Sequence, residues 1–163
     1  MGSSKLIYLA AVAALASGGC TYEPVTLPEI HGHRGCRGLL PENTLPAFLE
    51  AAEMGCDLLE LDVVITADSQ LLVSHEPWMS HRICRTPEGD SITEQQEHDF
   101  NIYRMTVAEA QSFDCGSTPQ VAFPDQELSP QFKPTLRQVV EAVDLKMMDN
   151  GTAGVGWNIE IKS

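Results

Sequence analysis

Apolar runs with strand character alternate with amphipathic helical stretches along the chain. The run LLELDVVI at 58–65 is apolar except for two acids, and LLVS at 71–74 follows after a short polar interval. An apolar run of this kind is typical of a strand that is covered on both faces, as in parallel sheets. A brief strand beginning at Ile30 and a later strand at 157–162, WNIEIK, are also predicted.

Three amphipathic helices are predicted among these strands. The first begins after Asn43 or Thr44 as N-cap and ends before Gly55, a short second helix begins at Thr106, and a third begins at Thr135. The apolar stripes are Leu45, Phe48, Leu49 and Ala52 in the first helix and Leu136, Val139, Val140 and Val143 in the third. Strands that alternate with helices run parallel, so the pattern predicts an α/β fold.

Two longer segments, 77–104 and 117–134, have no sustained periodicity and are predicted to be loops or insertions. The four cysteines that follow position 20 allow three pairings in an oxidising compartment, and the sequence does not choose among them. Cys84 and Cys115 bracket an irregular segment, which favours a bridge between them. Cys56 opens a buried strand and is expected to be a small core residue.

The first 20 residues have the pattern of an export signal. The positive charge of Lys5 precedes the apolar stretch LIYLAAVAALA, and small residues lead into Cys20. This order resembles a bacterial lipoprotein signal with lipid attached at Cys20, and plain secretory cleavage is the alternative. Residues 21–29 would then be a tether. We expect the protein in the periplasm or cell envelope, in contact with the membrane only through this anchor.

Composition and charge limit the kinds of partner. The 163 residues suffice for one domain with a core, and 43% hydrophobic with 20% charged residues is ordinary for a globular protein. Ten basic against 23 acidic residues give a formal net charge of −13, which repels nucleic acid and anionic membrane surfaces. We therefore expect no nucleic-acid partner, and an anionic ligand would need a local cationic site.

Glu60 and Asp62 are the first candidates for chemistry. They lie two residues apart in a predicted strand, so both side chains project from the same face. Two carboxylates this close in a buried setting need a cation, a shared proton or a basic partner. A hard divalent ion, Mg²⁺ or Ca²⁺, suits an all-oxygen pair. The alternative is a solvated strand end at which the two acids pair with surface lysines.

Polar residues follow or end each of the predicted strands. His33 and Arg34 follow the first strand, the two acids lie on the second, His75 follows the third, and Glu160 and Lys162 lie on the fourth. In parallel α/β sheets and barrels, the carboxyl ends of the strands converge on the functional site. We therefore expect these side chains to meet.

Short motifs spread over 33–162 together resemble one known family, the glycerophosphodiester phosphodiesterases. They are HRG at 33–35, PENT at 41–44, GCDLLELDV at 55–63, TAD at 66–68, VSHE at 73–76 and IEIK at 159–162. The resemblance implies a (β/α)8 TIM barrel, of which residues 30–163 would hold about the first four strands, the N-terminal half of the catalytic domain. Such a fragment is expected to be nearly inactive alone.

The resemblance also implies roles for individual residues. They are a catalytic acid/base pair of His33 and His75, metal ligands Glu60, Asp62 and Glu160, and substrate-site contacts Arg34, Lys162 and Asn43. The implied reaction is metal-dependent hydrolysis of a glycerophosphodiester, a small-molecule substrate of lipid metabolism. The glycerol hydroxyl attacks phosphorus, and water opens the resulting cyclic phosphate to give glycerol 3-phosphate and an alcohol.

Two other functions compete with this one. A sphingomyelinase D-like enzyme would share the histidines and carboxylates but act on intact lipid, and a non-catalytic lipoprotein would keep the barrel only as a binding scaffold. The remaining histidines, His31, His81 and His98, lack neighbouring motif residues and are expected at the surface.

Overall fold

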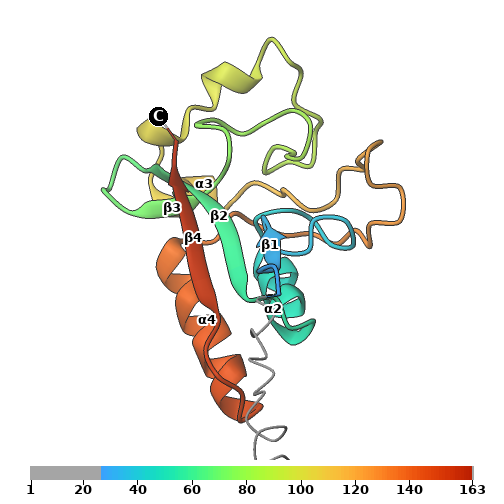
Figure 1. Cartoon of the computed structure of the whole chain (residues 1–163). Helices are drawn as coiled ribbons and strands as arrows, with labels where there is room; N and C mark the ends of the chain where they lie inside the picture. Colours follow the sequence, from blue (N-terminus) through green and yellow to red (C-terminus); the bar gives the residue numbers. More distant parts are fainter. Residues whose placement is uncertain (1–26, 163) are drawn as a thin grey trace, which may run out of the picture.

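A computed structural model describes residues 27–162 of the chain (Figure 1). In chain order its elements are β1 His31–His33, α2 Leu45–Glu53, β2 Leu58–Ile65, β3 Leu71–Val73, two 3-10 helices at Glu97–Asp99 and Ile102–Arg104, α3 Val107–Ala110, α4 Leu136–Asp149 and β4 Gly156–Ile161. The predicted signal segment 1–20, Cys20 and positions 21–26 of the tether lie outside the described residues. Within 27–162, no helix is both long and apolar enough to cross a membrane.

Strand β2 is the centre of the sheet, between β1 and β4 (Figure 1). Both neighbours run parallel to it, with His33 opposite Glu60 on one side and Glu160 opposite Asp62 on the other. Residues 59–64 of β2 are all buried, as the apolar run predicts. The predicted α/β architecture with parallel strands is therefore confirmed, and the sheet forms part of a barrel.

The prediction for β3 is wrong in its direction. β3 runs antiparallel to β2, with Val73 opposite Val63, so it is the return arm of a hairpin and not a further parallel strand. The intervening turn spans residues 66–70, which is too short for the crossover of a dozen or more residues that parallel strands require. Of the four predicted barrel strands, three are parallel strands in the described part of the chain: β1, β2 and β4.

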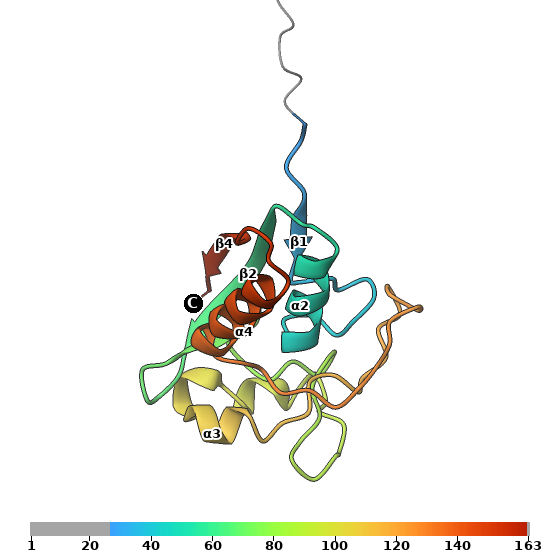
Figure 2. The ribbon, with the colours of Figure 1, turned by 90° about the horizontal axis from the view of Figure 1, so that it is seen from below.

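Helices α2 and α4 lie side by side on one face of this sheet (Figure 2). Phe48 of α2 and Val139 and Val143 of α4 are fully buried there. They pack against alternate residues of β2, namely Leu59, Leu61 and Val63. Because strand side chains alternate, the intervening residues of β2, including both acids, point to the opposite face. The helix layer therefore leaves the polar face of β2 available for a site.

Local signals at the helix ends behave as predicted. Thr44 is the N-cap of α2, and Gly55 follows its end with φ +84°. Thr106 and Thr135 each accept from a backbone amide three residues on, in a capping box that opens α3 and α4 respectively. The α3 helix itself is one turn long, shorter than the predicted stretch. These ends are correctly predicted because caps depend on neighbours in sequence.

The segments outside the sheet form a second apolar core together with Val64 of β2 and Leu72 of β3. It contains Met79, Ile83, Ile102 and Phe113, and a disulfide joins Cys84 to Cys115 within it, which is the favoured pairing. The other two described cysteines, Cys36 and Cys56, are free and half-buried. The loops above the sheet are thus held in place by burial and by one covalent link.

The prediction for His81 is wrong. This histidine is half-buried, and its Nδ1 lies 2.6 Å from Oε2 of Glu97, which is buried. The same carboxylate accepts a hydrogen bond from the backbone amide of His81, and together these contacts keep the pKa of Glu97 below its usual range in spite of burial, which acts the other way. A tertiary contact across 16 residues decides this placement, and no local pattern indicates it.

Candidate active site

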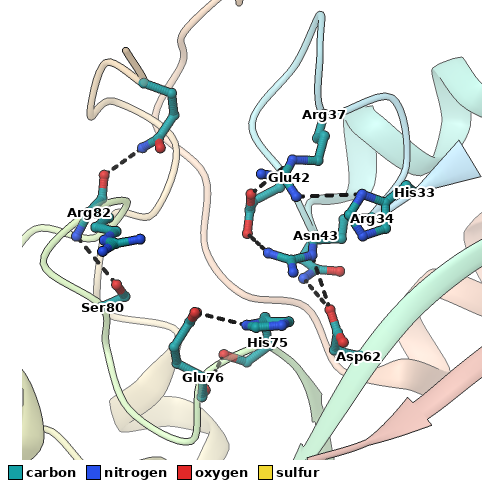
Figure 3. Close-up of polar contacts among 12 residues, drawn as sticks. His33, Arg34, Arg37, Glu42, Asn43, Asp62, His75, Glu76, Ser80 and Arg82 are labelled. Atoms are coloured by element: carbon teal, nitrogen blue, oxygen red, sulfur yellow. Dashed lines mark hydrogen bonds and ion pairs between the residues drawn. The ribbon is translucent and has the colours of Figure 1, made fainter. Parts of the chain in front are cut away.

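The predicted site residues meet at the carboxyl ends of the parallel strands. Figure 3 shows His33 and Arg34 from the end of β1, Asp62 from β2 and His75 from the turn after β3 around one space. Lys162 follows directly after β4, and its Nζ lies 3.2 Å from Oδ1 of Asp62. Residues separated by more than 100 positions in the sequence are therefore brought to the same edge of the sheet.

Three carboxylates form the centre of this group. Glu60, Asp62 and Glu160 each place an oxygen within 4.8 Å of the oxygens of the other two. Glu60 and Asp62 are buried, which excludes a solvated strand end for this pair. Glu160 lies on β4, which pairs only with β2 among the described strands, and its side chain is about half exposed. An all-oxygen set at this spacing fits a hard divalent cation.

Two cations also contact Asp62. Arg34 Nε lies 3.4 Å from its Oδ2, and Lys162 Nζ lies between Asp62 and Glu160, 2.6 Å from Oε2 of the latter. Hydrogen bonds from Lys162 to Glu160 and then to Asp62 raise the pKa of this lysine. Both groups can bind phosphate oxygens, because guanidinium and ammonium N–H groups donate strongly to anions. Asn43 adds a 3.4 Å contact from Nδ2 to Oδ2 of Asp62.

The loop after β1 has a backbone that only a few sequences can adopt. Arg34, Gly35 and Asn43 all have positive φ, at 54°, 80° and 57°. This conformation directs the backbone amide of Arg34 to Oε2 of Glu60, at 2.8 Å. Gly35, the glycine of the HRG motif, adopts this conformation without the steric cost that a Cβ would bring.

Glu42 was not predicted as a site residue, although it lies within the PENT motif. It is buried, and its two oxygens hold two arginines, Arg34 through Nη1 at 2.7 Å and Arg37 through Nε at 3.4 Å. Figure 3 shows it between these guanidinium groups. The signal that could have identified it is its place in the PENT motif, because both arginines precede it in the sequence, at positions 34 and 37.

The two histidines differ in their partners. Nδ1 of His75 lies 2.8 Å from Oε1 of Glu76, and because a carboxylate accepts, this nitrogen carries the proton and Nε2 remains for proton transfer. His33 is about half exposed, with Nε2 3.7 Å from Oε2 of Glu60 and Nδ1 3.4 Å from Nη1 of Arg37. Both rings can therefore exchange protons with a bound ligand.

Comparison with known proteins agrees with this geometry. Residues 33–162 match the sequence model of the glycerophosphoryl diester phosphodiesterase family. The chain belongs to this family. A family member of Bacillus subtilis, YhdW, which is provisionally assigned as a glycerophosphodiester phosphodiesterase, is 36% identical over 133 residues, or 82% of this chain and 44% of YhdW.

Two solved structures of phosphodiesterases resemble the chain. One, provisionally assigned to the same family, is from Silicibacter pomeroyi, with 32% identity and a TM-score of 0.71 over 86% of this chain and 47% of that one. The other, from Oleispira antarctica, was solved with its product sn-glycerol-3-phosphate and has 26% identity and a TM-score of 0.58 over 83% and 45%. The chain thus spans less than half the length of these relatives.

The family motif HRG makes a sharp prediction for Gly35. A Cβ at this position would lie 2.6 Å from the backbone carbon of Ala47, and φ is +80°. Gly35→Ala should therefore lower the free energy of unfolding by at least about 2 kcal/mol, measured by chemical denaturation. Gly38→Ala is the control, because nothing lies within 4 Å of a Cβ there. Equal stability of the two variants would contradict the role assigned to Gly35.

Proposed function

We propose that this chain is the part of a glycerophosphodiester phosphodiesterase that carries its metal ligands and its acid/base pair. The convergence of three carboxylates, two cations and two histidines at one strand edge carries the proposal. Family membership supports it, as does the relative solved with sn-glycerol-3-phosphate. The substrate would be a glycerophosphodiester, and the products would be glycerol 3-phosphate and an alcohol, in lipid metabolism on a complete (β/α)8 barrel.

The carboxylates Glu60, Asp62 and Glu160 would hold a divalent cation, Mg²⁺ or Ca²⁺. When bound, such an ion neutralises charge on phosphate oxygens and polarises phosphorus. Arg34 and Lys162, which now pair with Asp62, would donate to the same phosphate group. Asn43, buried beside Asp62, would hold that carboxylate in place.

His33 and His75 would transfer the protons of both steps. In the first step one imidazole accepts the proton of the attacking glycerol hydroxyl while the new O–P bond forms. The other imidazole, protonated, gives its proton to the leaving alcohol oxygen as the old P–O bond breaks. Water then opens the cyclic phosphate with the two roles exchanged, which restores both rings. Glu76 orients His75 throughout, because it accepts from Nδ1 at 2.8 Å.

The decisive experiment is an assay of glycerol 3-phosphate release from glycerophosphocholine by a purified protein that carries this chain within a complete barrel, since the fragment alone is expected to be nearly inactive. Release should require Mg²⁺ or Ca²⁺ and should stop on addition of EDTA. A parallel assay of choline lysolipid distinguishes the sphingomyelinase D-like alternative, in which the lipid alone would be cleaved. Glycerophosphocholine binding without turnover of either compound would favour the scaffold alternative and refute the proposed function.

A further inference from the structure

Lys133 is a buried cation to which neither the motifs nor the proposed mechanism assigns a role. It lies in the segment that leads into α4, directly before Pro134, whose carbonyl oxygen accepts from the amide of Val73 at 2.8 Å. Leu72 and Thr135 form an antiparallel bridge beside this contact. The segment therefore runs along β3, next to the turn that carries His75 and Glu76.

The Lys133 ammonium is buried without a close acidic partner. The residue is 2% exposed, and among residues 27–162 no carboxylate oxygen lies within 4.0 Å of its Nζ. Burial lowers the pKa of Lys133, whereas the charges of Glu76 and Glu42 at somewhat greater range act against this effect. Arg34 adds to the lowering, and Asp62 opposes it. The charged groups that act most strongly on this lysine thus belong to the candidate active site.

The fold gains little from a lysine at this position. An unpaired buried charge costs several kcal/mol relative to an apolar side chain of similar volume. Lysines that serve the fold are paired, as Lys146 of α4 is with Glu53 of α2, at 2.6 Å. An ammonium whose three N–H donors contact no carboxylate is instead typical of a group that binds an anionic ligand.

The surrounding charges indicate which ligand this group would serve. The site has five acids, Glu42, Glu60, Asp62, Glu76 and Glu160, and without Lys133 only three permanent cations, Arg34, Arg37 and Lys162. Glu42 engages two of these cations directly, and Asp62 and Glu160 engage the third. As long as the proposed divalent cation is not bound, an anion that enters here is repelled by the excess of carboxylates. A further ammonium that no acid occupies would offset this repulsion.

We propose that Lys133 is an additional anion-binding residue of the active site, whose ammonium donates to an oxygen of the substrate phosphate group. The proposal rests on the proposed function, since it takes the phosphodiester as the ligand. It extends the site to the segment 117–134, which the sequence shows only as a loop or insertion. The buried charge of Lys133 then lowers the stability of the free protein and raises its affinity for the anion.

The substitution Lys133→Met tests whether the ammonium favours anion binding at the expense of stability, because methionine keeps most of the length of the side chain and removes its charge. The affinity for sn-glycerol 3-phosphate, measured calorimetrically with EDTA and again with Mg²⁺, should fall by about 10-fold or more, as expected for the loss of a hydrogen bond to a charged group. The melting temperature should stay the same or rise. Lys146→Met is the control and should leave the affinity unchanged.

Two outcomes would overturn the role of Lys133. One is an unchanged affinity in Lys133→Met, and the other is a melting temperature several degrees lower, which would make the ammonium part of the fold. Binding of sn-glycerol 3-phosphate is read without turnover, so the test remains valid if the unsubstituted protein hydrolyses no glycerophosphodiester. In that case the proposed function would be refuted. The binding measurement with sn-glycerol 3-phosphate would still test whether Lys133 binds the anion.

Discussion

Replacing His75 with alanine in the full-length enzyme should lower the turnover of a glycerophosphodiester by about 10²-fold or more, the usual contribution of a positioned acid or base. The ring is held by Glu76 through Nδ1, so its Nε2 has a fixed orientation toward the site. Alanine removes the proton carrier and leaves the three carboxylates untouched. Steady-state release of glycerol 3-phosphate measures the loss, and affinity for Mg²⁺, measured calorimetrically, should stay nearly constant.

His31→Ala is the matched control for this experiment. His31 lies on the same short strand as His33 but is exposed, and its nearest acid is Glu29, at 3.8 Å and outside the site. This variant should turn over at the rate of the unsubstituted protein, whereas His33→Ala should fall with His75→Ala. Near-normal activity in His75→Ala would show that this imidazole carries no proton in the reaction.

The parts of the site that follow from strand periodicity could be predicted from the sequence. Glu60 and Asp62 share a face because strand side chains alternate, and the parallel register then places Glu160 beside Asp62. The positive φ of Gly35 follows equally from local rules. In each case, either the two-residue repeat of a strand or a local turn conformation determines the result. Both features can be recognised from a few neighbouring residues in the sequence.

The parts that depend on tertiary contact could not be predicted. The direction of β3 was missed because an apolar run has the same pattern in a hairpin arm as in a parallel strand, and only the short turn at 66–70 distinguishes them. Lys133 lies in a segment without periodicity, so nothing in its neighbours indicates that it is buried where the charges of Glu76 and Glu42 act on it. Burial of a charge is decided by the whole packing arrangement, which a sequence window does not contain.

Strand β4 shows that the sequence pattern gives the face on which a residue lies but not how far that residue is buried. The sequence places Ile159 and Ile161 on one apolar face of a strand, and these two side chains are 42% and 85% exposed. Among the described strands β4 is hydrogen-bonded only to β2, so its other edge is open within the described residues, which cover these two side chains only in part. Alternation thus predicts which residues share a face, whereas the neighbours that cover that face determine its burial.

Asp62→Asn should have the largest effect on ion binding. Asp62 is 1% exposed, and it is the one carboxylate that contacts both cations, Arg34 and Lys162, as well as Asn43. Asparagine keeps the shape but removes one of the negative charges that would offset a divalent ion. Affinity for Mg²⁺ or Ca²⁺ should fall by at least about 100-fold, since even the loss of a residue that only supports a ligand costs 10- to 100-fold.

The same substitution should abolish most turnover, because Arg34 and Lys162 lose the acid that sets their positions toward phosphate. Asp144→Asn, an exposed change on α4, is the control and should alter neither quantity. Ion affinity is measured by calorimetry and folding by circular dichroism, so that a misfolded variant is recognised. An Asp62→Asn protein that folds and binds both ions as tightly as the unsubstituted protein would remove Asp62 from the metal site. The two cations would then be the reason for its burial, since Arg34 and Lys162 already compensate its charge.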